Sequence, residues 1–190
     1  MSEIEDEELL RLAQTGGEAG FTGFVTRHQG PLLRYLLHQT GNIHRAEDLL
    51  QEVFLRVFNA GKSGRWQGRS NIRTWLFAIA RNIAIDDSRR RASRVTTGEA
   101  ADMHVIAADK TSDPIHQVTQ RESIVRTEKV LAQLPQPQRE VLGLRIFGNL
   151  SFPEIADVTQ TSLPTVKSRM RYALDKAREI LLQHERKIQS

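Results

Sequence analysis

The sequence predicts an all-α protein in which two helical domains are joined by a flexible linker, the C-terminal one containing a helix-turn-helix. Apolar residues recur at spacings of three and four over most of the 190 residues, as on helices that bury one face. Residues 94–117 break this pattern with scattered aspartates, a Thr-Thr-Gly and an Asp-Pro pair, which is typical of a linker. We therefore expect domains at residues 1–93 and 118–190, with the linker at 94–117.

Helical stretches also account for the first predicted domain. Residues 5–39 carry apolar residues at helical spacing with a break at Gly30-Pro31, which predicts two or three helices. Residues 44–60 then form an amphipathic helix with an acidic outer face. A glycine-rich basic loop at 61–70 follows, and a long basic helix runs from residue 71 to about 93.

The second predicted domain ends in a helix-turn-helix. Helical spacing resumes at Val118, stops at Pro135 and restarts up to Gly148. Ser151 and Glu154 fit a capping box, in which the serine side chain accepts an early backbone N–H and the glutamate reaches back. A short helix should therefore run to about residue 158.

The last helix should begin after a turn of three or four residues. Ser162 can cap it, and Pro164 falls in the first turn, where a missing N–H has no cost. One face is apolar and is expected to point inward, namely Val166, Met170, Ala173, Ala177 and Leu181. The opposite face carries Lys167, Ser168, Arg171, Asp175 and Arg178, which suits a DNA groove.

Composition excludes several classes of function. The chain has no cysteine, which removes disulfides, thiolate zinc sites and cysteine nucleophiles. The six histidines lack metal-ligand spacing, and there is no glycine-rich phosphate loop, so we expect no metal, no cofactor, no small-molecule substrate and no enzymatic activity. Asp86 and Asp87 are adjacent and point about 100° apart on a helix, so they do not form an acid/base pair. With an acidic amino terminus and no run long enough to span a membrane, the protein is expected to stay in the cytoplasm.

Two basic regions, separated by an acidic stretch, indicate two contacts with nucleic acid. In the last helix, Thr165, Lys167, Ser168 and Arg171 lie near the amino-terminal end that enters a major groove. The alternative for this helix alone is an ordinary solvated basic face.

The first basic region has aromatic residues among its cations. Trp66 lies in the glycine-rich loop, where an exposed ring between arginines would suit stacking on an unpaired base. The alternative is that the aromatic residues belong to the core. Helical spacing favours this alternative for Trp75 and Phe77, but not for Trp66.

The acidic face at residues 44–60 allows two interpretations. Its outward residues are Glu47, Asp48, Gln51 and Glu52. For an isolated helix such a face mainly provides solubility, although the acidic balance of the first 61 residues suggests a protein partner.

Taken in order, five stretches resemble the extracytoplasmic-function (ECF) class of bacterial RNA polymerase sigma factors. They are DEELLRLAQ at 6–14, AEDLLQEVF at 46–54, RTWLFAIARN at 73–82 followed by Ile85-Asp86, Leu134-Pro135 through REVL at 139–142, and TVKSR at 165–169. The resemblance covers nearly the whole chain. It implies a protein that binds core RNA polymerase and directs initiation at specific promoters.

The resemblance also implies site residues. The acidic face of Glu47, Asp48, Gln51 and Glu52 would dock on the clamp helices of the beta-prime subunit, and the second domain would contact the beta flap. The first domain would hold and melt the minus-ten element through Trp66, Arg73, Asn82, Arg89 and Arg90. The second would read the minus-thirty-five element as duplex through Thr165, Lys167, Ser168, Arg171 and Tyr172. Promoter DNA and an anti-sigma factor are the other expected partners.

Two residues depart from the family pattern. The usual glycine of the helix-turn-helix turn is Gln160 here, and the usual apolar residue after it is Thr161, so we expect strain or a shift at the left-handed position of the turn. Two rival functions follow from other features. An autonomous helix-turn-helix repressor or activator would explain only the second domain, and a nuclease would need a metal or nucleophile constellation that the sequence lacks.

Overall fold

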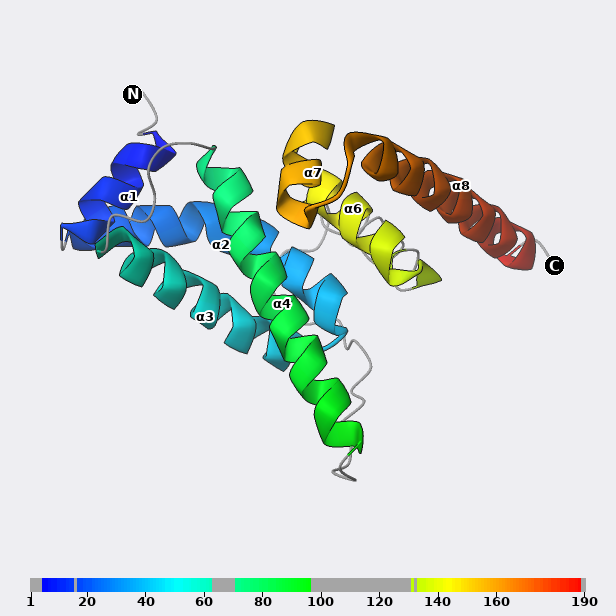
Figure 1. Cartoon of the computed structure of the whole chain (residues 1–190), viewed down its shortest axis with the longest axis horizontal. Helices are drawn as coiled ribbons and strands as arrows, with labels where there is room; N and C mark the ends of the chain where they lie inside the picture. The colour runs from blue at the N-terminus through cyan, green and yellow to red at the C-terminus, as the bar shows by residue number, and fades with distance from the viewer. Residues whose placement is uncertain (1–4, 16, 63–70, 97–130, 132, 189–190) are drawn as a thin grey trace.

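The computed structural model of the chain is helical and describes residues 5–15, 17–62, 71–96, 131 and 133–188. Figure 1 shows two groups of helices, α1 to α4 and α6 to α8, which we name the N-terminal and C-terminal modules. The modules contact each other where α4 packs on α7 and α2 packs on α6. The all-α prediction is confirmed for the described residues, none of which forms a strand. Residues 97–117 of the predicted linker and Trp66 lie outside them, as does nearly all of the helix expected from Val118. The prediction that the linker begins at residue 94 is wrong, because residues 94–96 still belong to the preceding helix, which ends at Thr96.

The first two helices are α1 (Asp6–Gln14) and α2 (Glu18–Thr40). The predicted break at Gly30-Pro31 is wrong, because α2 continues through Pro31. A proline inside a helix removes one hydrogen bond and costs about 3 kcal/mol. Phe24 before the proline and Leu32 and Tyr35 after it are fully buried, and their packing holds both halves of the helix in line.

A glycine ends α2 and an asparagine starts α3 (Ile43–Lys62). Gly41 takes the left-handed conformation with φ of 67°, and its N–H bonds the Leu37 carbonyl at 2.8 Å. The Asn42 side chain then accepts from the Arg45 N–H at 3.0 Å. This tight turn sets α3 beside α2, and Val53 and Val57 of α3 are buried in the hydrophobic core.

The long helix α4 (Ile72–Thr96) completes the N-terminal module. The Asn71 side chain accepts from the Arg73 N–H at 2.9 Å at its start. Arg45 of α3 makes a two-pronged ion pair with Asp87 of α4, donating from Nε to Oδ2 at 2.5 Å and from Nη2 to Oδ1. Asp87 therefore has a structural partner in the helix packed beside it.

The C-terminal module consists of α6 (Gln136–Ile146), α7 (Phe152–Thr159) and α8 (Leu163–Ile188). The predicted capping box is confirmed: Ser151 Oγ accepts from the Glu154 N–H, and Glu154 Oε2 accepts from the Ser151 N–H at 2.8 Å. The predicted cap at Ser162 is confirmed as well, because its Oγ accepts from the Thr165 N–H at 3.3 Å.

The inner face of α8 is shorter than the sequence predicts. Val166, Met170 and Ala173 are buried, but Leu181 is 42% exposed and the prediction of an inward Leu181 is wrong. In Figure 1, α8 extends well past the end of α6. Ile180, the residue before Leu181, is buried instead.

One hydrophobic core runs through both modules. It includes Phe77 from α4 and Leu150 from the C-terminal module, and Tyr35 of α2 packs edge-on against Phe77 with ring centroids 5.4 Å apart. Within the described residues, none of the helices combines the length and the apolar character that crossing a bilayer requires.

Candidate nucleic-acid and polymerase interface

The acidic face of α3 is a solvent-exposed surface. Glu47, Asp48 and Gln51 are exposed, whereas Glu52 is half-buried and forms an ion pair with Arg56 one turn later. The inward side of the same helix buries Ala46, Leu49 and Val53, which fixes which side faces out. Three of the four predicted residues are therefore available to a partner, and the fourth is engaged within its own helix.

Sequence reasoning missed one residue of this surface. Leu55 lies one turn after Gln51 and is 64% exposed. Single exposed apolar side chains are common on protein surfaces, but this one gives the acidic face an apolar neighbour, the combination of apolar centre and charged rim that protein interfaces use. Its place outside the apolar stripe of the helix was the available signal.

The predicted minus-ten residues on α4 divide between two faces of the helix. Asn82 and Arg89 are seven residues apart and lie on one exposed face, with Arg90 exposed beside them. Arg73 is nine residues before Asn82 and therefore lies on the opposite side, near the C-terminal module. The structure thus brings Asn82, Arg89 and Arg90 together and does not bring Arg73 to them.

The aromatic residues near this surface have different environments. Phe77 is buried and Trp75 is half-buried against the core, in agreement with the structural alternative for both. Trp66 lies outside the described residues, so its stacking role stays a prediction.

The turn between α7 and α8 keeps its expected geometry with an unexpected residue. Gln160 itself takes the left-handed conformation, with φ of 54° and ψ of 41°, so the turn is strained at this residue and is not shifted. Its side-chain amide donates to the Asp157 carbonyl at 2.6 Å, and the Thr161 N–H bonds the Ala156 carbonyl at 3.1 Å. These local hydrogen bonds offset part of the strain that a glycine would avoid.

The amino-terminal half of α8 presents the predicted minus-thirty-five residues outward. Lys167, Arg171 and Tyr172 are exposed, with the Arg171 guanidinium over the Tyr172 ring at 5.3 Å from its centroid. Ser168 and Thr165 are half-buried, and the Thr165 hydroxyl shares a 2.8 Å hydrogen bond with Ser162. Four of the five thus lie on one outward face, while Thr165 also helps to start the helix.

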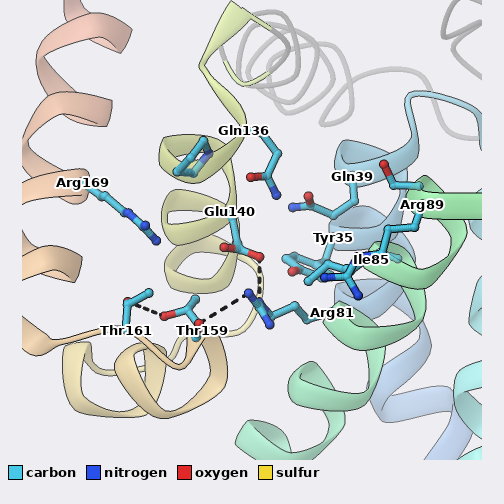
Figure 2. Close-up of a pocket in the computed structure, with 13 residues that line it drawn as sticks. Tyr35, Gln39, Arg81, Ile85, Arg89, Gln136, Glu140, Thr159, Thr161 and Arg169 are labelled. Carbon is cyan, nitrogen blue, oxygen red and sulfur yellow. Dashed lines mark hydrogen bonds and ion pairs between the residues drawn. The ribbon is translucent and has the colours of Figure 1, made fainter. Parts of the chain in front are cut away.

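A polar contact surface joins the modules, and we call it the seam. Across it, Thr74 Oγ1 donates to Glu154 Oε1 at 2.6 Å, and Arg81 Nε donates to Glu140 Oε1 at 2.8 Å. Arg81 also reaches the Thr159 carbonyl at 3.5 Å. Figure 2 shows Glu140 of α6 and Arg81 of α4 facing each other beside a pocket of about 390 Å³.

That pocket draws its walls from both modules. Tyr35 and Gln39 come from α2, Arg89 from α4, and Thr161 and Arg169 from the turn and the start of α8. Figure 2 shows their polar groups directed into the space between the helices. Sequence reasoning did not bring these residues together, because they come from separate parts of the chain.

Burial at the seam changes the protonation of several groups. Burial raises the pKa of the Tyr35 phenol above its usual range, and the nearby Glu140 charge adds to the effect. Burial lowers the pKa of His38 to about 4, helped by the charge of Arg139. For Glu154, burial works against the charge, but hydrogen bonds from Ser151 and Thr74 outweigh it and lower the pKa. Glu154 is therefore held as a carboxylate against α4.

The part of the chain that the structure describes holds no group of three or more histidine, aspartate or glutamate side chains that would bind a metal ion.

Comparisons with known families match the two modules separately. The family described as Sigma-70 region 2 matches residues 24–94, which run from α2 to the end of α4. The family described as Sigma-70, region 4 matches residues 124–176, which include α6, α7 and the first half of α8.

Two known proteins are similar to this chain over nearly its whole length. The RNA polymerase sigma-H factor of Pseudomonas aeruginosa is 31% identical over 191 aligned positions, covering 96% of this chain and 98% of that protein. The ECF RNA polymerase sigma factor SigC of Mycobacterium tuberculosis is 32% identical and covers 90% of each chain.

Two solved structures resemble the fold. CnrH in complex with the cytosolic domain of CnrY has a TM-score of 0.64 at 22% identity, over 93% of this chain and 96% of that one. RpoE of Bartonella quintana, in complex with the anti-sigma factor NepR, has a TM-score of 0.67 at 23% identity, over 85% of this chain and 96% of that one.

Proposed function

Because the chain belongs to the sigma-70 family of transcription initiation factors, and to its extracytoplasmic-function class, we propose that it binds core RNA polymerase and directs it to promoters by recognising two DNA elements. One observation carries this proposal beyond the family. The start of α8 buries Val166 and Met170 while it exposes Lys167 and Arg171, so a basic face is open to a major groove.

Each module has its own task in this proposal. The C-terminal module reads the minus-thirty-five element as duplex through Lys167, Ser168 and Arg171 and contacts the beta flap of the polymerase. The N-terminal module holds the melted minus-ten element on the face of α4 that carries Asn82 and Arg89. The acidic face of α3, with Leu55 beside it, docks on the beta-prime clamp helices.

We also propose that the protein acts in the cytoplasm and does not catalyse a reaction of its own. CnrH and RpoE are described in complexes with CnrY and with the anti-sigma factor NepR, and we include an anti-sigma factor among the partners proposed for this chain.

Run-off transcription tests the function directly. Purified core polymerase is incubated with and without this protein on a promoter library, and transcripts are sequenced. Discrete start sites that require the protein and share two upstream elements are the expected result. DNA binding without polymerase, and no initiation, would instead favour an autonomous repressor. Core binding without any initiation would favour an interaction protein.

A further inference from the structure

We propose that the pocket lined by α2, α4, α6 and α8 is a binding site for a small organic phosphate monoester. Its phosphate pairs with arginines of the pocket, and its neutral part accepts hydrogen bonds from Tyr35 and Gln39. The site goes beyond the proposed function and does not depend on it. The pocket volume of about 390 Å³ falls within the roughly 300–1,000 Å³ of small-molecule sites, so it suits a ligand with an organic body and not a single inorganic ion.

Two buried polar groups of α2 lack partners at this pocket. Tyr35 is fully buried, and neither its phenol oxygen nor Gln39 Nε2 has a hydrogen-bond partner among the described residues. Unpaired buried polar groups are costly and rare, and these two lie four residues apart on one helix face. Figure 2 shows both side chains directed from α2 into the space beside α6. A ligand that accepts hydrogen bonds would satisfy both groups.

The charged lining of the pocket is mainly cationic. Arg81, Arg89 and Arg169 line it together with one acid, Glu140. The Arg81 Nε donates to Glu140 Oε1 at 2.8 Å, so these two charges largely cancel. Arg89 is exposed and Arg169 is half-buried, and neither guanidinium has an ion-pair partner among the described residues. Two such arginines at one pocket favour an anionic ligand.

The number of these arginines favours a phosphate monoester over a carboxylate. A phosphate monoester carries a charge of about −1.5 to −2 at neutral pH, which matches two guanidinium groups, and its oxygens fit their planar donors. A carboxylate would supply a single charge. The apolar side chains of Ala84, Ile85 and Pro137 also line the pocket, and the organic part of the ligand can pack on them.

Titration calorimetry on the purified full chain, without DNA or polymerase, tests the site. The probes are adenosine 5′-monophosphate and ribose 5-phosphate, with adenosine and inorganic phosphate as partial ligands. We expect at least one monophosphate to bind saturably with a Kd below about 1 mM. Each partial ligand should bind at least about tenfold more weakly, because it keeps only part of the contacts. No saturable binding by either monophosphate, or equally tight binding of inorganic phosphate, would overturn the proposal.

Tyr35→Phe isolates the buried hydroxyl. Because this hydroxyl has no partner in the fold, the variant should melt at the wild-type temperature or above it, yet bind the monophosphate about tenfold more weakly. Arg169→Gln should weaken binding by at least the same factor. The matched control is Arg34→Gln on α2, the same change at an exposed arginine outside the pocket, which should keep wild-type affinity.

A further variant separates the pocket from the surface proposed for duplex DNA. Arg171 lies two residues after Arg169 and therefore on another side of α8. Loss of monophosphate binding in Arg171→Gln, with wild-type affinity in Tyr35→Phe and Arg169→Gln, would place the probe on the DNA surface and overturn the site. Run-off transcription reports on the proposed function separately. A chain that initiates but binds no monophosphate would refute only the pocket, and the reverse result would refute only the proposed function.

Discussion

The acidic surface of α3 and the basic surface of α4 belong to one helical module, yet they differ in availability. Glu47, Asp48 and Gln51 face solvent on α3. On α4, Arg81 is only 17% exposed at its side chain and is paired with Glu140 of the other module. A run of like charge in the sequence therefore indicates the sign of a surface, whereas packing decides whether that surface is already occupied.

Reversing a charge on the available surface should have the largest effect. Asp48→Arg is expected to weaken binding to core polymerase by roughly 100-fold, about 2.7 kcal/mol, because a favourable contact becomes a repulsive one. Fluorescence anisotropy with labelled protein measures this. The matched control is Glu7→Arg on α1, an exposed acid that makes the same charge change away from α3. Equal losses in both variants would mean that net charge, and not the α3 surface, sets the affinity.

Protonation at the occupied surface should loosen it. His38 of α2 stacks on Phe147 of the C-terminal module with ring centroids 4.9 Å apart, and burial, with the charge of Arg139, lowers its pKa from 6.5 to about 4. The folded chain therefore binds fewer protons at His38 than the unfolded chain does. Its stability is complete above about pH 6.5 and falls as the pH approaches 4, by about 2 kcal/mol at pH 5.

Thermal unfolding at pH 7 and pH 5 measures this effect. His38→Gln removes the titrating group, so the difference in stability between the two pH values should be smaller in that variant than in wild type. A pH dependence that is the same in both proteins would remove His38 from the seam energetics.

Two arginines of α3 form ion pairs that differ in burial, and their removal should therefore differ in its effect on the stability of the fold. Arg45 makes the two-pronged pair with Asp87, whose side chain is 12% exposed, so Arg45→Ala leaves a nearly buried carboxylate and should cost about 2 kcal/mol. Arg56 pairs with Glu52 within one exposed helix, so Arg56→Ala should cost less than about 0.5 kcal/mol. Urea unfolding gives both values. Equal losses of stability in the two variants would contradict the expectation that burial decides the cost of removing the arginine.

Local features of the fold were predictable, and long-range ones were not. The capping box at Ser151 and the cap at Ser162 depend on residues three positions apart, so the sequence alone identified them. Pro31 was misread because packing from elsewhere in the chain overrides the cost of a proline. The Arg81–Glu140 pair joins residues 59 positions apart, and no local pattern marks it.

The same limit applies to the candidate site. Helical spacing identified the exposed face of α3 and the outward face of α8, because one helix decides them. Helical spacing also separates Arg73 from Asn82 on α4, but which of the two sides faces the C-terminal module depends on where α7 packs. Leu55 is exposed for a similar long-range reason, since no described helix covers that part of α3.

Leu55 tests whether the available surface has an apolar centre. Leu55→Ala should weaken core binding by about tenfold, or about 1.4 kcal/mol, because a partner would bury most of this side chain. Stability should not change, since the residue is 64% exposed in the free protein. Leu182→Ala, at an exposed leucine of α8, is the control and should leave core affinity as it is. Full affinity in Leu55→Ala would place the contact elsewhere on α3.

The smallest expected effect concerns two turns with the same backbone conformation. Gly41 after α2 and Gln160 after α7 both take the left-handed region, and only the glutamine is strained there. Gln160→Gly should stabilise the protein by about 0.5 kcal/mol, because relief of strain exceeds the lost hydrogen bond to Asp157 and the added freedom of the unfolded chain. Gly41→Gln should destabilise it by about 1 kcal/mol, and because a Cβ there would touch nothing within 4 Å, the cost is that of the backbone alone. Urea unfolding of both variants measures the pair. Destabilisation by Gln160→Gly would show that the glutamine amide, and not the backbone conformation, dominates the turn that positions α8 for DNA.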